Sequence, residues 1–188
     1  NDCTYFHSKE FGGEFIPVLE IKTGNSGGNE FTPISDTYIA ENHPDYVMGD
    51  LDFYRTRGLD QWRFHVLVRF DISSVSQGTN IESATLKMYY YQNEDGNPSG
   101  HILNVNRIVS DWDESVTSWN NQPSYIEQET SYDIVPSSFG WMNWDVTEDV
   151  EMFVNGEATN YGWEVIDTYN NNDCTYFHSK EFGGEFIP

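Results

Sequence analysis

The sequence has few basic residues and very little cysteine. Among its 188 residues, 9 are Lys or Arg and 31 are Asp or Glu, which gives a formal net charge of −22. A surface this acidic repels nucleic acid and anionic membranes, so we expect neither as a partner. The sequence also lacks an apolar run of about 18 residues, and we therefore expect no membrane insertion. Aromatic residues make up 16% of the chain, which argues against disorder despite the charge.

Motifs of several catalytic classes are also missing. The histidines are scattered, without the HxH or HExxH spacing of zinc sites, and we find no phosphate-binding loop and no recognisable Ser-His-Asp arrangement. Glu114, close to Trp112 and Trp119, could be a catalytic acid of a glycoside hydrolase. It is better explained as a hydrogen-bond partner of Thr117 or of nearby backbone. We therefore expect that the protein is not an enzyme.

What the sequence does contain is an internal duplication. Asn1–Pro17 and Asn172–Pro188 share one 17-residue sequence, NDCTYFHSKEFGGEFIP, at an offset of 171 residues. Either the duplication is an artefact, or it indicates a tandem array whose period is a whole domain rather than a solenoid unit. The two cysteines, Cys3 and Cys174, hold the same position in the two copies. Each unit thus has one cysteine, and we expect a buried or free thiol rather than a disulfide within the unit.

The hydrophobic pattern is that of an all-β protein. Apolar and polar residues alternate in several segments separated by turn-forming residues, as half-buried antiparallel strands require: 64–70, 84–91, 102–108 and 162–167. One short helix is expected over 145–154, because acids begin it and Asn155-Gly156 ends it. Many strands with little helix predict an antiparallel β-sandwich of jelly-roll type, with at most one short helix.

Motifs spread over nearly the whole unit resemble the DNRLRE domain family, which includes disaggregatase-related repeats and alginate-binding carbohydrate modules. The motifs follow one another in the family's order: Asp36–Ile39, Val68–Ser74, Ile81–Leu86, Trp112–Glu114, Val116–Pro123, Trp144–Thr147 and Asn160–Gly162. The resemblance implies an extracellular jelly roll, often part of a cell-surface protein. It does not by itself imply an enzyme.

The resemblance also suggests how the domains are divided. The family's last two strands correspond to 177–188 followed by a strand like 18–21. Residues 1–24 are then the closing strands of a preceding repeat, or are donated to a neighbouring unit, and 25–30 form a Gly-rich linker. The jelly roll covers 31–188 and is completed by the equivalent of 18–21. The residues expected at the junction between units come from both copies: Cys3, Phe6, Phe11, Phe15, Pro17, Cys174, Phe177, Phe182, Phe186 and Pro188.

The acidic composition also suits a hard cation. Ca²⁺ takes six to eight oxygen ligands, and a strong negative charge favours its binding. Jelly-roll carbohydrate modules often hold one structural Ca²⁺ near their terminal strands. Asp36, Glu41 and Asp145 are the expected ligands.

These features favour one function and leave two alternatives. The first interpretation is a structural repeat unit of an extracellular filament or surface sheath, with copies of itself as partners and edges hidden by strand sharing. The first alternative is a carbohydrate-binding module for acidic polysaccharide, supported by clustered arginines and aromatic side chains that could stack on sugar rings: Arg55, Arg57, Arg63, Arg69, Tyr46, Phe53, Tyr54, Trp62, Tyr125 and Tyr132. The second alternative is a non-catalytic domain of a glycan-degrading surface enzyme.

Overall fold

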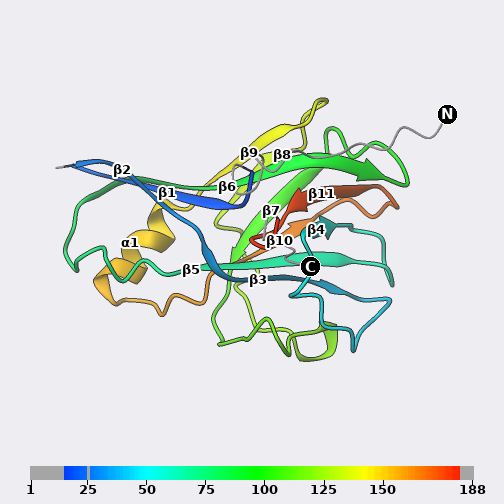
Figure 1. Ribbon diagram of the computed structural model, residues 1–188, viewed down its shortest axis with the longest axis horizontal. Helices are drawn as coiled ribbons and strands as arrows, with labels where there is room; N and C mark the ends of the chain where they lie inside the picture. Colours follow the sequence, from blue (N-terminus) through cyan, green and yellow to red (C-terminus); the bar gives the residue numbers. More distant parts are fainter. Residues whose placement is uncertain (1–14, 25, 183–188) are drawn as a thin grey trace, which may run out of the picture.

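Two antiparallel β-sheets packed face to face form the protein in the computed structural model, which describes residues 15–24 and 26–182 (Figure 1). Sheet A contains β1 (Val18–Thr23), β2 (Ser26–Phe31), β4 (Phe53–Thr56), β6 (Ile81–Glu94), β9 (Gly140–Asp145) and β11 (Cys174–His178). Sheet B has the order β3 (Pro33–Ala40), β5 (Phe64–Phe70), β10 (Trp163–Asp167), β7 (Ile102–Arg107) and β8 (Ser131–Ile134). The predicted all-β sandwich is confirmed.

The core lies between the sheets and follows the period of two that the sequence shows. Along β6, every second side chain from Ala84 to Tyr90 is buried against sheet B, while the residues between them are more exposed. The largest fully buried side chains of the core come from both sheets: Trp144, Trp163, Tyr38, Tyr54, Phe64, Phe70 and Phe177. Burial of this much aromatic surface is the main stabilising term of the fold.

The single helix, α1 (Thr147–Asn155), closes one end of the sandwich, on the left of Figure 1. Asp145 lies two residues before the helix, and its Oδ1 accepts a hydrogen bond from the Thr147 amide at 3.0 Å. Gly156 ends it in the left-handed conformation, with φ of 75°. A 3-10 turn, η1 (Trp119–Asn121), is the other helical segment among the described residues. Within that part of the chain, neither element is long and apolar enough to cross a membrane.

Strands β1 and β11 follow each other along one edge of β6. Residues 85–90 of β6 pair with β9, and this stretch overlaps the β6 residues that pair with β1 (81–87) and with β11 (90–94). Because a strand has two edges, β9 occupies one of them and β1 and β11 share the other. Both run antiparallel to β6, so β1 continues the line of β11.

The segment expected to be a linker is a strand instead. Ser26–Phe31 forms β2, which pairs antiparallel with β1, and Phe31 lies opposite Leu19 and packs against the core. The Gly-rich composition suggested a linker, but the pairing of β2 with β1 makes this segment the edge strand of sheet A. In the structure, strand β1 (Val18–Thr23) is part of sheet A of the same chain. The assignment of 1–24 to a preceding repeat stays a prediction.

The described cysteine is a buried free thiol. Cys174 is fully buried at the start of β11, and its Sγ accepts a hydrogen bond from Arg57 Nε at 3.0 Å. Burial raises the pKa of this thiol, which makes it unreactive in the folded state. The expectation of a buried or free thiol is thus confirmed for Cys174; Cys3 lies outside the described residues.

Candidate functional site

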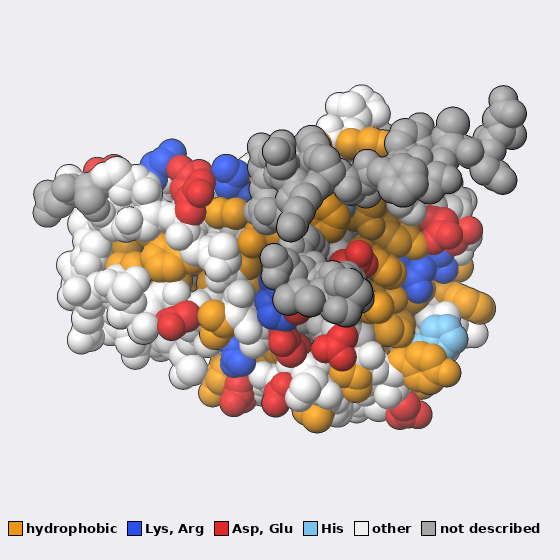
Figure 2. Space-filling view, in the orientation of Figure 1, with side chains coloured by type: hydrophobic (Ala, Val, Ile, Leu, Met, Phe, Trp, Pro, Cys, Tyr) orange, Lys and Arg blue, Asp and Glu red, His pale blue; other side chains and the backbone are white. Residues whose placement is uncertain are grey.

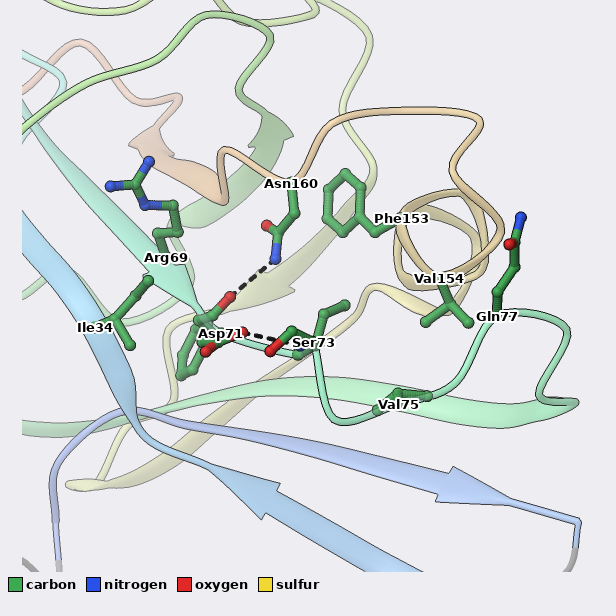
Figure 3. A pocket seen from close by; sticks show the side chains of 11 residues that line it. Ile34, Arg69, Asp71, Ser73, Val75, Gln77, Phe153, Val154 and Asn160 are labelled. Atoms are coloured by element: carbon green, nitrogen blue, oxygen red, sulfur yellow. Dashed lines mark hydrogen bonds between the residues drawn. The ribbon is translucent and has the colours of Figure 1, made fainter.

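Two surface hollows of comparable size differ in what their polar groups already bind. The first, of about 480 Å³, lies between α1 and the loop after β5 (Figure 3). Its polar side chains bond to the protein itself: Asn160 Nδ2 donates to the Phe70 carbonyl at 2.8 Å, and Asp71 accepts from the Ser73 amide at 2.9 Å. Arg69 pairs with Asp111. These three side chains therefore already have partners within the protein.

The second hollow lies at the outer face of sheet B and is better equipped to bind a ligand. We call it the Trp119 groove; it measures about 560 Å³ and is lined by Arg63, His65, Trp119, Gln122, Pro123, Ser124, Tyr125 and Glu127. Strand β5 and the loop that precedes it supply His65 and Arg63, and the segment from η1 onward supplies the other side chains. The groove thus combines two aromatic rings with several polar groups, as small-molecule and sugar sites do.

The floor of the groove contains a buried pair of ionisable groups. His65 and Glu164 are 5% and 0% exposed, and His65 Nδ1 lies 2.7 Å from Glu164 Oε1. When the ring is neutral, Nδ1 donates to Glu164, and Nε2 is left as an acceptor on a side chain that lines the groove. Glu164 Oε2 is buried without a hydrogen-bond partner in the described part of the chain. A buried acceptor that stays unpaired costs about 1–3 kcal/mol.

Trp119 is held in place from several sides. Its ring meets the His65 ring edge to face, with centroids 5.0 Å apart, and the Arg63 guanidinium lies over it at 5.3 Å. Arg63 is itself fixed by Glu41, which accepts two hydrogen bonds from its guanidinium at 2.6 and 2.8 Å. Asn120 ties η1 to the loop after β3 through Asp45. The half-buried indole is therefore a rigid platform rather than a free surface side chain.

Tyr125 is the second aromatic side chain that lines the groove. It is half-buried, and burial raises the pKa of its hydroxyl, with Glu164 and Glu127 adding to the effect. The hydroxyl therefore stays protonated and is a hydrogen-bond donor at neutral pH.

A row of outward side chains leads from the groove across sheet B. Cross-strand pairing aligns His65 with Ile166, Ile166 with Asn104, and Asn104 with Tyr132. His65 is buried, Ile166 and Asn104 are half-buried, and Tyr132 on the edge strand β8 is 59% exposed. Three inter-strand spacings place Tyr132 about 14 Å from His65. The groove and this row together form one elongated surface.

The charges of the protein do not form a basic groove. Each Lys or Arg of the described residues pairs with at least one carboxylate. Arg55, Arg57, Arg63 and Arg69, which the sequence places close together, pair with Glu94, Asp95, Glu41 and Asp111 respectively. On the face drawn in Figure 2, the Lys and Arg groups are scattered and lie beside Asp and Glu side chains.

The three residues predicted as calcium ligands have separate partners. Asp36 is fully buried and accepts a hydrogen bond from the Lys180 amide at 2.9 Å. Glu41 binds Arg63, and Asp145 binds Thr147 at the start of α1. Among residues 15–24 and 26–182, no group of three or more His, Cys, Asp or Glu side chains could hold a metal ion. Calcium binding stays a prediction, and these residues already have other roles.

The predicted junction residues and aromatic platforms are placed as follows. Phe177 and Pro17 are buried, Phe15 packs on Tyr89 and Phe182 on His178; Cys3, Phe6, Phe11, Phe186 and Pro188 lie outside the described residues.

Of the candidate stacking residues, Tyr54 is buried and Phe53 packs against the core, whereas Tyr46, Trp62 and Tyr132 are exposed and Tyr125 lines the groove. Glu114 accepts from the Asp36 amide and from Lys180, so it is a structural group as expected, with other partners than Thr117.

His65 and Glu164 belong to no motif that predicts a site from the sequence. Both stand at outward positions of strands whose neighbouring residues are apolar, and this is the signal that could have identified them. Their pairing is decided by the register of β5 against β10, which the sequence alone does not give.

The β-sandwich presents an aromatic-lined groove on one sheet, the kind of concave site that ligands occupy. Residues 28–186 match carbohydrate-binding module family 96, and the chain belongs to this family. The match supports the carbohydrate-binding side of the resemblance seen in the sequence; the DNRLRE name stays a prediction. A comparison with curated proteins gives no match. Modules of this class are typically non-catalytic.

Proposed function

We propose that the chain binds an extracellular polysaccharide in the Trp119 groove and along the row that ends at Tyr132. The observation that carries the proposal is the combination of a fixed indole with the His65–Glu164 pair behind it. A sugar ring presents an apolar face of C–H groups and a rim of hydroxyls. Trp119 offers a surface for the apolar face, while His65 and Tyr125 offer an acceptor and a donor to the hydroxyls.

The charges favour a neutral polysaccharide segment over the acidic one expected from the clustered arginines. Arg63 is the arginine that lines the groove, and Glu41 already neutralises it. Glu127 and the buried Glu164 add negative charge to the same region. The carboxylates of a polyuronate would be repelled by Glu127 and Glu164 and would compete with Glu41 for Arg63. A neutral polysaccharide meets only hydrogen-bonding groups.

Affinity electrophoresis and calorimetry against a panel of glycans test the proposal. The panel holds neutral β-glucans, mannan and xylan beside alginate and polygalacturonate. We expect binding to a neutral member that changes little between 50 and 500 mM salt. Binding to a polyuronate alone, weakened strongly by salt, would instead support the acidic-polysaccharide alternative.

Trp119→Ala tests the location of the site. Central aromatic residues of an interface commonly contribute about 2 kcal/mol or more, so we expect about a 30-fold loss of affinity. Trp62→Ala is the matched control, because Trp62 is 49% exposed and does not line the groove. Equal losses in both variants would rule out the groove as the binding site.

A structural role in a filament or sheath is a second candidate function. It is favoured by the letter-for-letter duplication of 17 residues and by the way β1 continues the line of β11 on β6. The two functions are compatible, since the Trp119 groove lies on sheet B and the shared edge lies in sheet A. Electron microscopy of the native material would reveal such a filament by its repeat.

A further inference from the structure

The shared edge of β6 is assembled from parts of both copies of the duplicated sequence. Residues 174–182 come from the C-terminal copy and form β11 and the turn after it. Phe15–Pro17, which lead into β1, come from the N-terminal copy. Phe15 and Phe182 cover neighbouring rings of one aromatic surface, with centroids 4.2 Å from Tyr89 and 3.5 Å from His178.

Several side chains of β11 and of the turn after it each make a specific contact with the rest of the protein. Arg57 donates to Cys174 at 3.0 Å, and Arg55 donates to the Tyr176 hydroxyl at 3.1 Å. Phe177 is fully buried in the core. After the strand, Ser179 Oγ donates to the Leu51 carbonyl at 2.6 Å, and Lys180 pairs with Asp36 and Glu114.

Every one of these contacting residues is present a second time. Cys3, Tyr5, Phe6, Ser8 and Lys9 repeat Cys174, Tyr176, Phe177, Ser179 and Lys180 in the same order. Each chain therefore contains two segments of identical sequence, 3–7 and 174–178, that could occupy the position between β6 and β4. The contacts that bind one copy are chemically able to bind the other.

The N-terminal copy also has the chain length to fill this position. Phe177 pairs with Tyr90 and Val18 pairs with Lys87, so the two strands are separated by about 10 Å along β6. Residues 8–17 would join Cys3–His7 in the β11 position to β1. Ten residues span up to about 33 Å when extended. A single continuous segment, residues 3–23, thus matches the whole edge.

We propose that the β11 position is a strand-acceptor site in which residues 3–7 and 174–178 exchange, and that the surplus copy joins a second molecule of this chain. When Cys3–His7 fills the site, the C-terminal copy is released. A released strand of matching sequence is a ligand for the same site in another molecule, in the manner of strand addition to a sheet edge. Copies of the chain are the partner that this chemistry selects.

Proline substitutions in the full chain test the exchange. Phe177→Pro removes a buried ring and a backbone donor from β11, and Phe6→Pro makes the equivalent substitution in the sequence of the other copy. We expect each single variant to unfold cooperatively near the wild-type temperature, because the remaining copy fills the site. The double variant F6P/F177P is expected to lose the transition. If F177P is as unfolded as the double variant, the N-terminal copy cannot replace β11 and the proposal is wrong.

Mixing experiments test the joining of molecules. The double variant folds only when another molecule supplies its β11 strand, and the wild type carries one surplus copy that can do so. We expect a 1:1 complex of the two by light scattering. The matched control is F6P mixed with the double variant: F6P has a single usable copy, so no complex should form. Absence of a complex in both mixtures would overturn intermolecular exchange.

Thiol labelling provides a readout without destabilised variants. In Cys3→Ser, Cys174 is the remaining thiol, and it is fully buried while β11 is in place. Exchange exposes it, so we expect labelling under native conditions faster than global unfolding. Labelling no faster than global unfolding would contradict the proposal.

Discussion

His65 Nδ1 and Glu164 Oε1 lie 2.7 Å apart beneath the Trp119 groove, with both side chains buried. A second histidine–carboxylate pair exists elsewhere in sheet B: His101 Nδ1 lies 2.9 Å from Asp167 Oδ2, and both of these side chains are buried as well. The two pairs are chemically alike but differ in location, because His101 does not line the groove. Substitutions in the two pairs can therefore distinguish the contribution of a buried histidine–carboxylate pair to stability from its contribution to ligand binding.

We predict that Glu164→Gln lowers both stability and glycan affinity, whereas Asp167→Asn lowers stability alone. Each substitution removes a charge-assisted hydrogen bond, which contributes about 1.5–3 kcal/mol to the free energy of unfolding. In Glu164→Gln the side-chain amide is also able to donate to His65 Nδ1, which turns Nε2 from an acceptor into a donor, so we expect about a tenfold loss of affinity. Denaturant unfolding and calorimetry measure the two effects. Unchanged affinity in Glu164→Gln would exclude His65 from the binding site.

The length of the binding surface leads to a prediction for Tyr132. Since Tyr132 lies about 14 Å from His65 along the cross-strand row, only a ligand of several sugar units reaches both. We expect Tyr132→Ala to weaken binding of long oligosaccharides about 2–12-fold, the range of one partly exposed aromatic contact of about 0.5–1.5 kcal/mol. Binding of a disaccharide should be unchanged. A loss that does not depend on ligand length would contradict the extended surface.

The fold could be predicted from the sequence where the pattern is local. The alternation in β5 and β6 and the acids and Gly156 around α1 identify these elements directly. Strand β2 could not be recognised, because Gly27 and Gly28 disfavour a strand and only pairing with β1 makes this segment one. Its structure is set by a neighbour rather than by its own residues.

The binding site was harder to predict than the fold, for a physical reason. Trp119 and His65 are far apart in the sequence, and their contact depends on how the loop carrying η1 lies against sheet B. The clustered arginines were misleading for the opposite reason: Arg55, Arg57 and Arg63 are close in sequence, yet each finds its own carboxylate. Proximity in sequence does not fix which charge is neutralised.

Asp36 gives a prediction for the dependence of stability on pH. Burial raises the pKa of this carboxyl from 3.8 to about 7, although Lys180 opposes the shift. A raised carboxyl pKa means that the folded state binds the proton more tightly than the unfolded state does. The resulting stabilisation is present below pH 3.8 and is lost as the pH rises through about 7.

Asp36→Asn stays uncharged throughout this range and should not show that loss. We expect the free energy of unfolding of the variant, relative to wild type, to rise between pH 4 and pH 7, by up to about 4 kcal/mol. Denaturant titrations at several pH values provide the measurement. Parallel stability curves for the two proteins would show that Asp36 does not titrate with folding.

Gly162, just before β10, is required by both its conformation and its surroundings. Its φ is 81°, in the left-handed region, and a Cβ at this position would lie 2.0 Å from the carbonyl oxygen of Val68. Gly78 has nearly the same conformation, with φ of 79°, but a Cβ there meets nothing within 4 Å. Comparing alanine substitutions at Gly78 and Gly162 therefore distinguishes the cost of backbone strain from the cost of a steric clash.

We predict that Gly78→Ala costs about 1–2 kcal/mol of unfolding free energy, the price of a left-handed alanine. Gly162→Ala should cost at least about 4 kcal/mol, because the strands β5 and β10 must move apart to accept the methyl group. Since these strands carry His65 and Glu164, Gly162→Ala should also weaken glycan binding in whatever fraction remains folded. Thermal unfolding and calorimetry on both variants measure the difference. Equal destabilisation by the two substitutions would mean that the close approach of Gly162 to Val68 is not a constraint on the fold.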